Sequence, residues 1–312
     1  MAVNIEANSD IKITNSDLPA LFTAAEGAAI EAKRNYLRLT IGDLGLLVLG
    51  TLLLSIQLSS EVGRVLVGFL AVTCFIGSFV VTIRILEAQH EKVWYGARAV
   101  AETVKTLSWK YMTCSEPFTS KLSSSEADEE FISKLTKILS ERGGVLWSFN
   151  GDLATGSEIT DTMRKIRSLD LEKRKQIYLE QRINDQRRWY GHNAKQNKVN
   201  ALRWFSAVLL AQLLAVLFTV VFTIAIVGRF ELPINFAHVF SSVAIAFLAW
   251  IQVKQHQELA QSYGVTAHEL GLIAEQISYI KTEEELCKFV SESENAISRE
   301  HTLWVARRER LI

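Results

Sequence analysis

Apolar residues are gathered into two separate parts of the chain, and the longest uninterrupted run covers residues 204–228. Its 25 residues carry no formal charge. A helix of that length rises about 1.5 Å per residue, enough to cross a bilayer core of about 30 Å. A second uncharged run follows after a short break around Pro233. The pattern predicts two membrane spans, at about 203–228 and 232–253, that are joined as a helical hairpin.

The first half of the chain shows the same pattern and predicts an earlier hairpin, with spans at about 39–58 and 64–84. Asp43 lies near the start of the first of these spans. A carboxylate at the centre of a span costs about 2.5–3.5 kcal/mol, whereas one near its edge can reach the lipid headgroups. We therefore expect an all-α membrane protein whose four transmembrane helices form two hairpins.

Outside the spans, apolar residues recur at helical spacing among charged ones, which is typical of amphipathic helices. No proline lies between the second span and Pro117, so this span is expected to continue as one helix into the polar phase. Residues 171–228 contain no proline and one internal glycine. As a continuous helix they would approach about 87 Å in length. These long helices are expected to extend into a cytosolic helical bundle.

The remaining polar segments predict two further helices and a domain boundary. A short helix is expected at 129–142, followed by a glycine-rich loop or small hairpin at 143–156. Thr282 followed by Glu285 forms a capping box that predicts where the last helix begins. The expected buried face of that helix consists of Leu286, Phe289, Val290, Ile297 and Trp304. The boundary predicts two-transmembrane units at 1–150 and 151–312.

Basic residues set the expected orientation in the membrane. Residues 187–203 carry five basic residues and no acidic one, whereas the only charged residues in the loop after the third span are Arg229 and Glu231. Positive flanks belong on the cytoplasmic side. The chain is therefore predicted to be a multi-pass protein of the inner membrane, with both termini in the cytoplasm.

Charge balance and motifs argue against several other function classes. The chain has 34 basic and 34 acidic residues, so it lacks the positive surplus of a nucleic-acid-binding protein. Its three cysteines have no metal-ligand spacing, and no cofactor or metal is expected. The sequence contains no phosphate loop, HExxH motif or nucleophile elbow, so enzyme activity has no positive support. Surface or packing roles are expected for His192, His256, His268 and His301.

The two halves follow one plan, in which a polar helix leads into a span, a short turn, a second span and an amphipathic helix. Residues 32–35 (AKRN) before the first span resemble residues 194–197 (AKQN) before the third. Tyr95-Gly96 after the second span likewise resembles Tyr263-Gly264 after the fourth. The shared plan predicts an internal repeat of one two-transmembrane unit.

Particular residues around the second hairpin resemble a known family. Before it lie Tyr178, Arg182, Asp185-Gln186, Trp189-Tyr190, Ala194 and Asn197, and near the C-terminus lie Glu294, Ala296-Ile297, Glu300 and Trp304. These residues resemble the SLATT family, whose two-transmembrane effector domains are associated with bacterial nucleotide-second-messenger synthases and SLOG sensors. The first half is similar to another SLATT variety through Trp94, Ala99, Glu102, Trp109 and Tyr111. The resemblance implies a pore-forming effector that damages the host membrane in phage defence, with a separate synthase or sensor as a candidate partner.

Small residues recur every four positions in the third span, from Ala207 through Ala211, Ala215, Thr219 and Thr223. One interpretation is close helix packing, because lipid provides no hydrophobic drive for helix association and small side chains let backbones approach. The other is a pore wall, in which Thr219, Thr223 and the neighbouring Gln212 offer polar groups to water or ions. In the fourth span, Ser241, Ser242 and Gln252 are weaker candidates of the same kind.

The segment before the third span has a candidate regulatory role. Basic residues there would attract anionic headgroups, and Trp189 and Tyr190 would anchor the interface. The alternative is a topology signal combined with ordinary packing. Together with Arg182 and Asp185, the two aromatic residues form a candidate membrane-interface or relay site, which would carry a partner's signal into the hairpin.

Three functions are compatible with this sequence. The first is a pore-forming effector that oligomerises and permeabilises the inner membrane when triggered, since four spans are too few to enclose a wide pore alone. The second is a non-conducting membrane scaffold or sensor that recruits cytosolic partners. A membrane-bound enzyme acting on lipid is a weaker third, because a catalytic constellation is missing.

Overall fold

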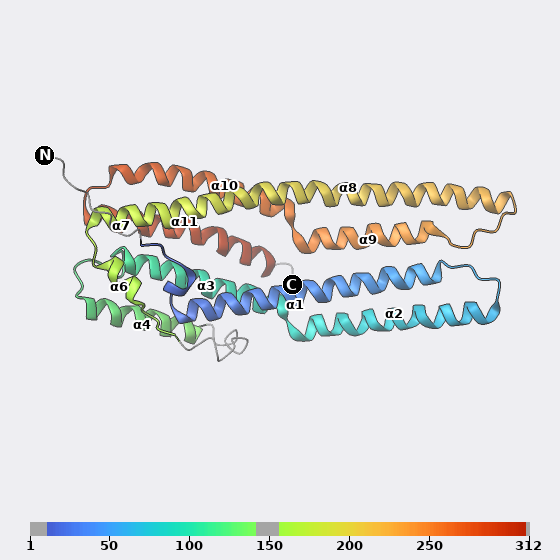
Figure 1. Cartoon of the computed structure of the whole chain (residues 1–312), viewed down its shortest axis with the longest axis horizontal. Helices are drawn as coiled ribbons and strands as arrows, with labels where there is room; N and C mark the ends of the chain where they lie inside the picture. Colours follow the sequence, from blue (N-terminus) through green and yellow to red (C-terminus); the bar gives the residue numbers. More distant parts are fainter. Residues whose placement is uncertain (1–10, 142–155, 310–312) are drawn as a thin grey trace. The chain divides into compact units, whose positions relative to one another are not determined.

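The computed structural model describes residues 11–141 and 156–309, with side chains described as far as residue 298. The long helices are α1 (Ala20–Leu54), α2 (Glu61–Ala88), α3 (His90–Met112), α4 (Ser124–Glu141), α8 (Asp185–Val227), α9 (Phe236–Lys254), α10 (His256–Gln276) and α11 (Glu283–Glu309) (Figure 1). Shorter elements are α6 (Asp161–Arg167), α7 (Leu171–Tyr178), the π-helical turn η3 (Leu179–Asn184) and the 3-10 turns η1 (Asn15–Asp17) and η4 (Ile277–Tyr279). The predicted all-α class is confirmed.

The chain folds as two compact units. Unit 1 takes Met1–Glu31, Lys92–Gly191 and Gly264–Ile312, and unit 2 takes Ala32–Glu91 and His192–Tyr263. Helices α1, α3, α8 and α10 each contribute residues to both units. Four helices of the described chain are long and apolar enough to cross a membrane, as the sequence predicts.

Unit 2 consists of two antiparallel hairpins, α1 with α2 and α8 with α9 (Figure 1). Gly50 makes room for the ring of Phe75, because a Cβ at this glycine would lie 2.7 Å from Cε1 of that ring. In the second hairpin Trp204 packs edge-on against Phe247, with ring centroids 5.4 Å apart. Most span side chains nevertheless point outward, including Val216, which is 62% exposed. An apolar surface of this extent is suited to lipid rather than to water.

The turns of the two hairpins are joined by backbone hydrogen bonds. The N–H of Gln57 donates to the carbonyl of Pro233 at 2.7 Å, and the N–H of Asn235 donates to the carbonyl of Ser55 at 2.9 Å. Ile56 and Ile234 thereby form an isolated antiparallel β-bridge. This bridge satisfies backbone groups that would otherwise lack partners at the ends of the helices.

The expectation that the second span continues as one helix is wrong at Gln89. This residue has a φ of 45°, in the left-handed region, and it separates α2 from α3. Gln255, with a φ of 47°, separates α9 from α10 in the same way. Both glutamines are followed by histidine, so the break recurs at the same place in each half. Non-glycine residues in this conformation cost about 1–3 kcal/mol and persist only where the surrounding structure supports them.

Unit 1 is a helical bundle in which several helices begin at side-chain caps. The last helix starts at the predicted capping box, since the N–H of Glu285 donates to Oγ1 of Thr282. Helix α4 begins at Ser124, five residues before the predicted start. The reason is a capping box that the sequence analysis missed, in which Ser123 and Glu126 exchange hydrogen bonds. Residues 143–155 of the loop predicted at 143–156, and the predicted boundary at 150, lie outside the described residues, as does the side chain of Trp304.

Candidate functional site

The centre of unit 1 contains a fully buried ion pair at a π-helical turn. The turn η3 follows α7 directly and carries Arg182, which is 1% exposed. Its guanidinium donates through Nε and Nη2 to the two carboxylate oxygens of Glu294 in α11, at 2.8 and 2.7 Å. Glu294 is 0% exposed. Such turns inside α-helices frequently occur at functional sites, so this pair is our first candidate site.

Two neutral donors complete the shell of the carboxylate. The phenol of Tyr178 donates to Oε1 of Glu294 at 3.1 Å, and the hydroxyl of Thr106 in α3 donates to Oε2 at 2.8 Å. We name these residues, Thr106, Tyr178, Arg182 and Glu294, the central cluster. Each carboxylate oxygen accepts two hydrogen bonds, which offsets the loss of solvation that burial imposes on a charge.

Burial and the nearby Glu294 shift the pKa values of two members of the central cluster, Arg182 and Tyr178. Burial opposes the charge on Arg182, but the attraction and hydrogen bonds of Glu294 outweigh burial and raise the pKa of the guanidinium. Burial and the adjacent charge of Glu294 raise the pKa of the Tyr178 phenol well above its usual value. The phenol therefore remains a hydrogen-bond donor at physiological pH. One Arg182 nitrogen, Nη1, is buried without a hydrogen-bond partner among the described residues.

Further charges extend from the central cluster along α3. Arg98 donates to Glu26 of α1 at 3.0 Å and forms an ion pair with Glu102 at 2.6 Å. Lys105 lies one helical turn further along, and burial together with the nearby Arg182 lowers the pKa of its ammonium group. With Arg182 and Glu294, these side chains make three basic and three acidic groups. The formal charges of the central cluster and of this row along α3 are thus equal in number and opposite in sign.

Aromatic rings hold the phenol of Tyr178 in position. Trp109 of α3 meets its ring edge-on with centroids 5.7 Å apart, and Phe289 of α11 does so at 6.2 Å. The packing connects α3, α7 and α11 around one buried side chain. A change in any of these helices would therefore displace a donor to Glu294.

The residues of the predicted relay site do not all gather at one place. Arg182 joins the central cluster, whereas Asp185 lies on the surface, 3.8 Å from Arg188. Tyr190 is 5% exposed and Trp189 is 43% exposed, and their rings meet edge-on at 5.0 Å. The structure thus separates the buried Arg182 and Tyr190 from the exposed Asp185 and Trp189. It also places Glu294 and Thr106, which were not part of the predicted site, beside Arg182.

The small-residue stripe of the third span divides between two faces of α8. Ala211 and Ala215 are buried in unit 2, with 4% and 9% of their surface exposed. Gln212, Thr219 and Thr223 are exposed. The hydroxyls of Thr219 and Thr223 donate to backbone carbonyls one turn earlier, at 2.7 and 2.8 Å. The alanines therefore pack within the chain, while the polar side chains face outward.

Two polar contacts in unit 2 escaped the sequence analysis. Asp43 accepts a hydrogen bond from the hydroxyl of Ser78 in α2 at 2.5 Å, so its carboxylate has a partner within the hairpin. His256 is 8% exposed, and its Nδ1 lies 2.7 Å from Oδ1 of Asn197. Its expected packing role is correct, but its partner was not identified. The repeated glutamine-histidine pair at 89–90 and 255–256 was the signal that could have drawn attention to it.

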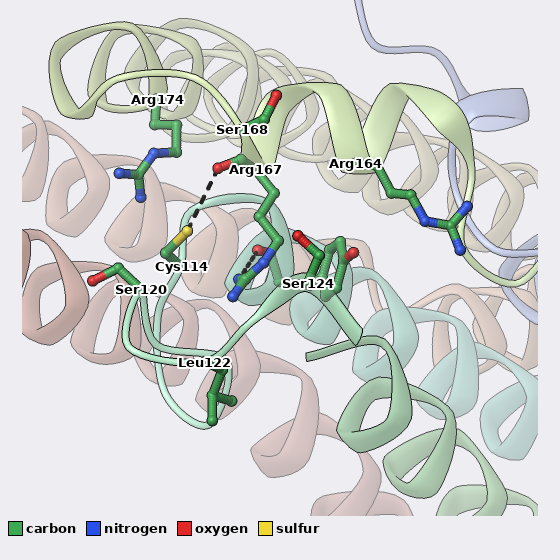
Figure 2. Close-up of a pocket in the computed structure, with 9 residues that line it drawn as sticks. Cys114, Ser120, Leu122, Ser124, Arg164, Arg167, Ser168 and Arg174 are labelled. Atoms are coloured by element: carbon green, nitrogen blue, oxygen red, sulfur yellow. Dashed lines mark hydrogen bonds between the residues drawn. The ribbon is translucent and has the colours of Figure 1, made fainter. Parts of the chain in front are cut away.

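A surface pocket of about 220 Å³ lies near the loop after α3 (Figure 2). It is lined by Tyr111, Cys114, Ser120, Leu122, Ser124, Arg164, Arg167, Ser168 and Arg174. Its guanidinium groups are engaged in the fold: Arg164 binds Asp128, Arg167 donates to three backbone carbonyls and Arg174 binds Glu283. The described residues contain no group of three or more metal-ligating side chains. We therefore interpret the pocket as structural.

Two family models cover most of the chain. The model described as SMODS and SLOG-associating 2TM effector domain 3 matches residues 19–175. The model described as SMODS and SLOG-associating 2TM effector domain 1 matches residues 178–304. No curated protein and no solved structure matches the chain. The central cluster draws on both matched regions, with Thr106 from the first and the other three residues from the second.

Proposed function

Because the chain belongs to the SLATT family and carries two varieties of the domain in tandem, we propose that it is a bacterial defence effector that permeabilises a membrane. In this proposal, copies of the chain oligomerise through their hairpins and open a path across the inner membrane when a signal arrives. Both termini and unit 1 face the cytoplasm, as the distribution of basic residues favours. The chain acts on the membrane itself and has no enzymatic activity.

The observation that carries this proposal is the continuity from the central cluster into a span. Residues Leu171–Val227 form one 57-residue run of helix that contains Tyr178, Arg182 and a candidate membrane span. A rearrangement at the π-helical turn would shift or rotate every later residue of that helix. In this proposal the buried ion pair is the element that switches, because separating its two charges is costly and a signal that breaks the pair would favour a different packing of η3 and α11.

The signal is expected to reach unit 1 from a separate protein or a small molecule. A nucleotide-second-messenger synthase or sensor is the candidate partner that the family description suggests. We propose that binding to unit 1 disturbs the contact between η3 and α11. Trp189 and Tyr190 then relay the change along α8 toward the membrane.

A second candidate function is a non-conducting scaffold or sensor that recruits cytosolic proteins. The observation in its favour is an exposed apolar line on α10 and the turn after it. Val265, Leu272 and Tyr279 recur every seven residues and are 59%, 70% and 78% exposed. Such a line suits a partner helix.

Dye release from liposomes would separate the two candidates. The purified protein should release a small encapsulated dye when the central cluster is disturbed, and induced expression in a bacterium should depolarise the membrane and arrest growth. The exposed-pair variant Arg188→Met serves as the matched control, because its charge lies outside the central cluster. Intact dye retention under every condition that alters unit 1 would contradict permeabilisation and favour the scaffold.

A further inference from the structure

An uninterrupted line of exposed side chains runs along α8 through the span. Its members are Phe205, Leu209, Gln212, Val216, Thr219, Thr223 and Ile226, and all of them are exposed. Their spacings alternate between four and three residues, which is the heptad pattern of a helix that packs against another helix. We name these residues the α8 seam. The buried Ala211 and Ala215 lie outside it, on the face that packs within unit 2.

Gln212 makes the α8 seam unsuitable as a surface for lipid alone. Its side chain is exposed and has no hydrogen-bond partner among the described residues. It lies nine residues beyond Arg203, about 13 Å into the span at 1.5 Å per residue. A carboxamide has two N–H donors and a carbonyl acceptor, and hydrocarbon offers a partner to neither.

We propose that the α8 seam is where copies of this chain pair with one another, with the Gln212 carboxamides hydrogen-bonded across the interface. The occupant is a second copy because a carboxamide is complementary to itself, donating and accepting at once. Copies inserted in one membrane share an orientation, so two seams meet in parallel and each residue meets its equivalent at the same depth. A polar residue at one core position of such a helix pair fixes its register.

This inference rests on the oligomerisation that the proposed function requires, and it names the surface involved. The hydroxyls of Thr219 and Thr223 already donate to their own helix, which leaves oxygen lone pairs available along the seam. The seam is therefore polar at three positions and apolar at four. The Gln212 amides are expected to provide the directional contact, and Phe205, Val216 and their neighbours to provide the packing.

Cysteine crosslinking in vesicles of bacterial polar lipid tests the proposal. In the full-length chain with Cys74, Cys114 and Cys287 replaced by alanine, single cysteines are placed at positions 209, 210, 212, 213 and 216. The matched controls are Leu210→Cys and Leu213→Cys, since both leucines are exposed, at 57% and 66%, but lie off the seam. Copper-phenanthroline oxidation should yield a band of twice the chain mass at 209, 212 and 216 and little at the control positions.

A second pair of variants measures how much the Gln212 carboxamide contributes to self-association. Gln212→Leu should weaken self-association in the vesicles by about 3- to 30-fold, the range expected for one interhelical hydrogen bond in a membrane. Gln212→Asn keeps the amide and should retain part of the association. Equal crosslinking at all five positions, strongest crosslinking at 210 or 213, or unchanged association of Gln212→Leu would each overturn the proposal.

The same vesicles, loaded with dye, distinguish this inference from the proposed function. Seam-specific crosslinking without dye release under any trigger would support the interface and contradict the pore. Dye release without crosslinking at 209, 212 or 216 would contradict the interface and leave permeabilisation in place.

Discussion

Breaking the buried ion pair should destabilise unit 1 more than removing any charge on its surface. In Arg182→Met, the carboxylate of Glu294 keeps only the hydrogen bonds from Tyr178 and Thr106. Both partners of the pair are at most 1% exposed, so water cannot replace the missing guanidinium. Removing one member of a buried pair costs about 3–5 kcal/mol. That loss is comparable with the lower end of the total stability of a typical domain, which is about 5–15 kcal/mol.

The double variant separates the ion pair from the space that it fills. In Glu294→Leu the Arg182 guanidinium is left buried and unpaired, and a similar loss of about 3–5 kcal/mol is expected. With both replacements together no unpaired charge remains. The hydroxyl groups of Tyr178 and Thr106 then have no acceptor, and each unsatisfied hydroxyl lowers the stability by about 1–3 kcal/mol. The double variant should therefore be clearly more stable than the sum of the single changes predicts, with a coupling energy of about 2 kcal/mol or more.

Urea unfolding in detergent, combined with hydrogen exchange of η3 and α11, would measure these differences. The matched control is Arg188→Met, whose partner Asp185 is 3.8 Å away and whose side chain is 67% exposed. Exposed pairs contribute about 0.2–1 kcal/mol, so this variant should unfold nearly as the parent does. Additive effects of the two central substitutions, or a loss in Arg182→Met no larger than in the control, would refute the assigned role of the pair.

Three further predictions concern groups near this region. Burial and the nearby Arg182 lower the pKa of Lys105, so the unfolded chain binds that proton more strongly and the free energy of unfolding rises with pH until about 10.4, the pKa of an unperturbed lysine. Lys105→Met should raise the melting temperature at pH 7 and flatten the rise of stability with pH. An unaltered dependence of the melting temperature on pH would contradict this role of Lys105. Burial raises the pKa of Cys114 despite the nearby Arg167, so iodoacetamide at pH 8 should label it more slowly than the partly exposed Cys287, with the difference lost on unfolding. Replacing Trp189 and Tyr190 together by alanine should uncouple triggering from dye release while insertion remains normal, and normal triggering would exclude the relay.

The membrane hairpins could be predicted because length and charge alone determine whether a helix suits a bilayer. The break at Gln89 could not, since neither glycine nor proline marks it and its left-handed conformation depends on tertiary packing. The start of α4 was misplaced for a simpler reason. The capping pair Ser123 and Glu126 lies in a serine- and acid-rich stretch that also resembles a linker.

Site residues were harder to predict because their contacts span long sequence distances. Tyr178, Arg182 and Glu294 all belong to the family pattern, but nothing in their spacing places residues 182 and 294 in contact. The small-residue stripe shows a geometric limit. Four residues turn an α-helix by about 40° more than a full turn, so from Ala211 to Thr223 the stripe rotates by about 120°. Its first members therefore face the chain's own helices, while its last members face outward.

The backbone bridge between the two turns also limits how the hairpins can be arranged in an assembly of several chains. Gln57 and Asn235 tie the hairpin of one variety to the hairpin of the other, so each chain contributes both as a pair. An assembly of any size then contains an even number of hairpins, with equal numbers of each variety. In a single cyclic ring, the order of rotational symmetry therefore equals the number of chains, which is half the number of hairpins. If this bridge opened, the number of hairpins would stay even because each chain carries both, but the two hairpins of one chain would no longer have to lie side by side.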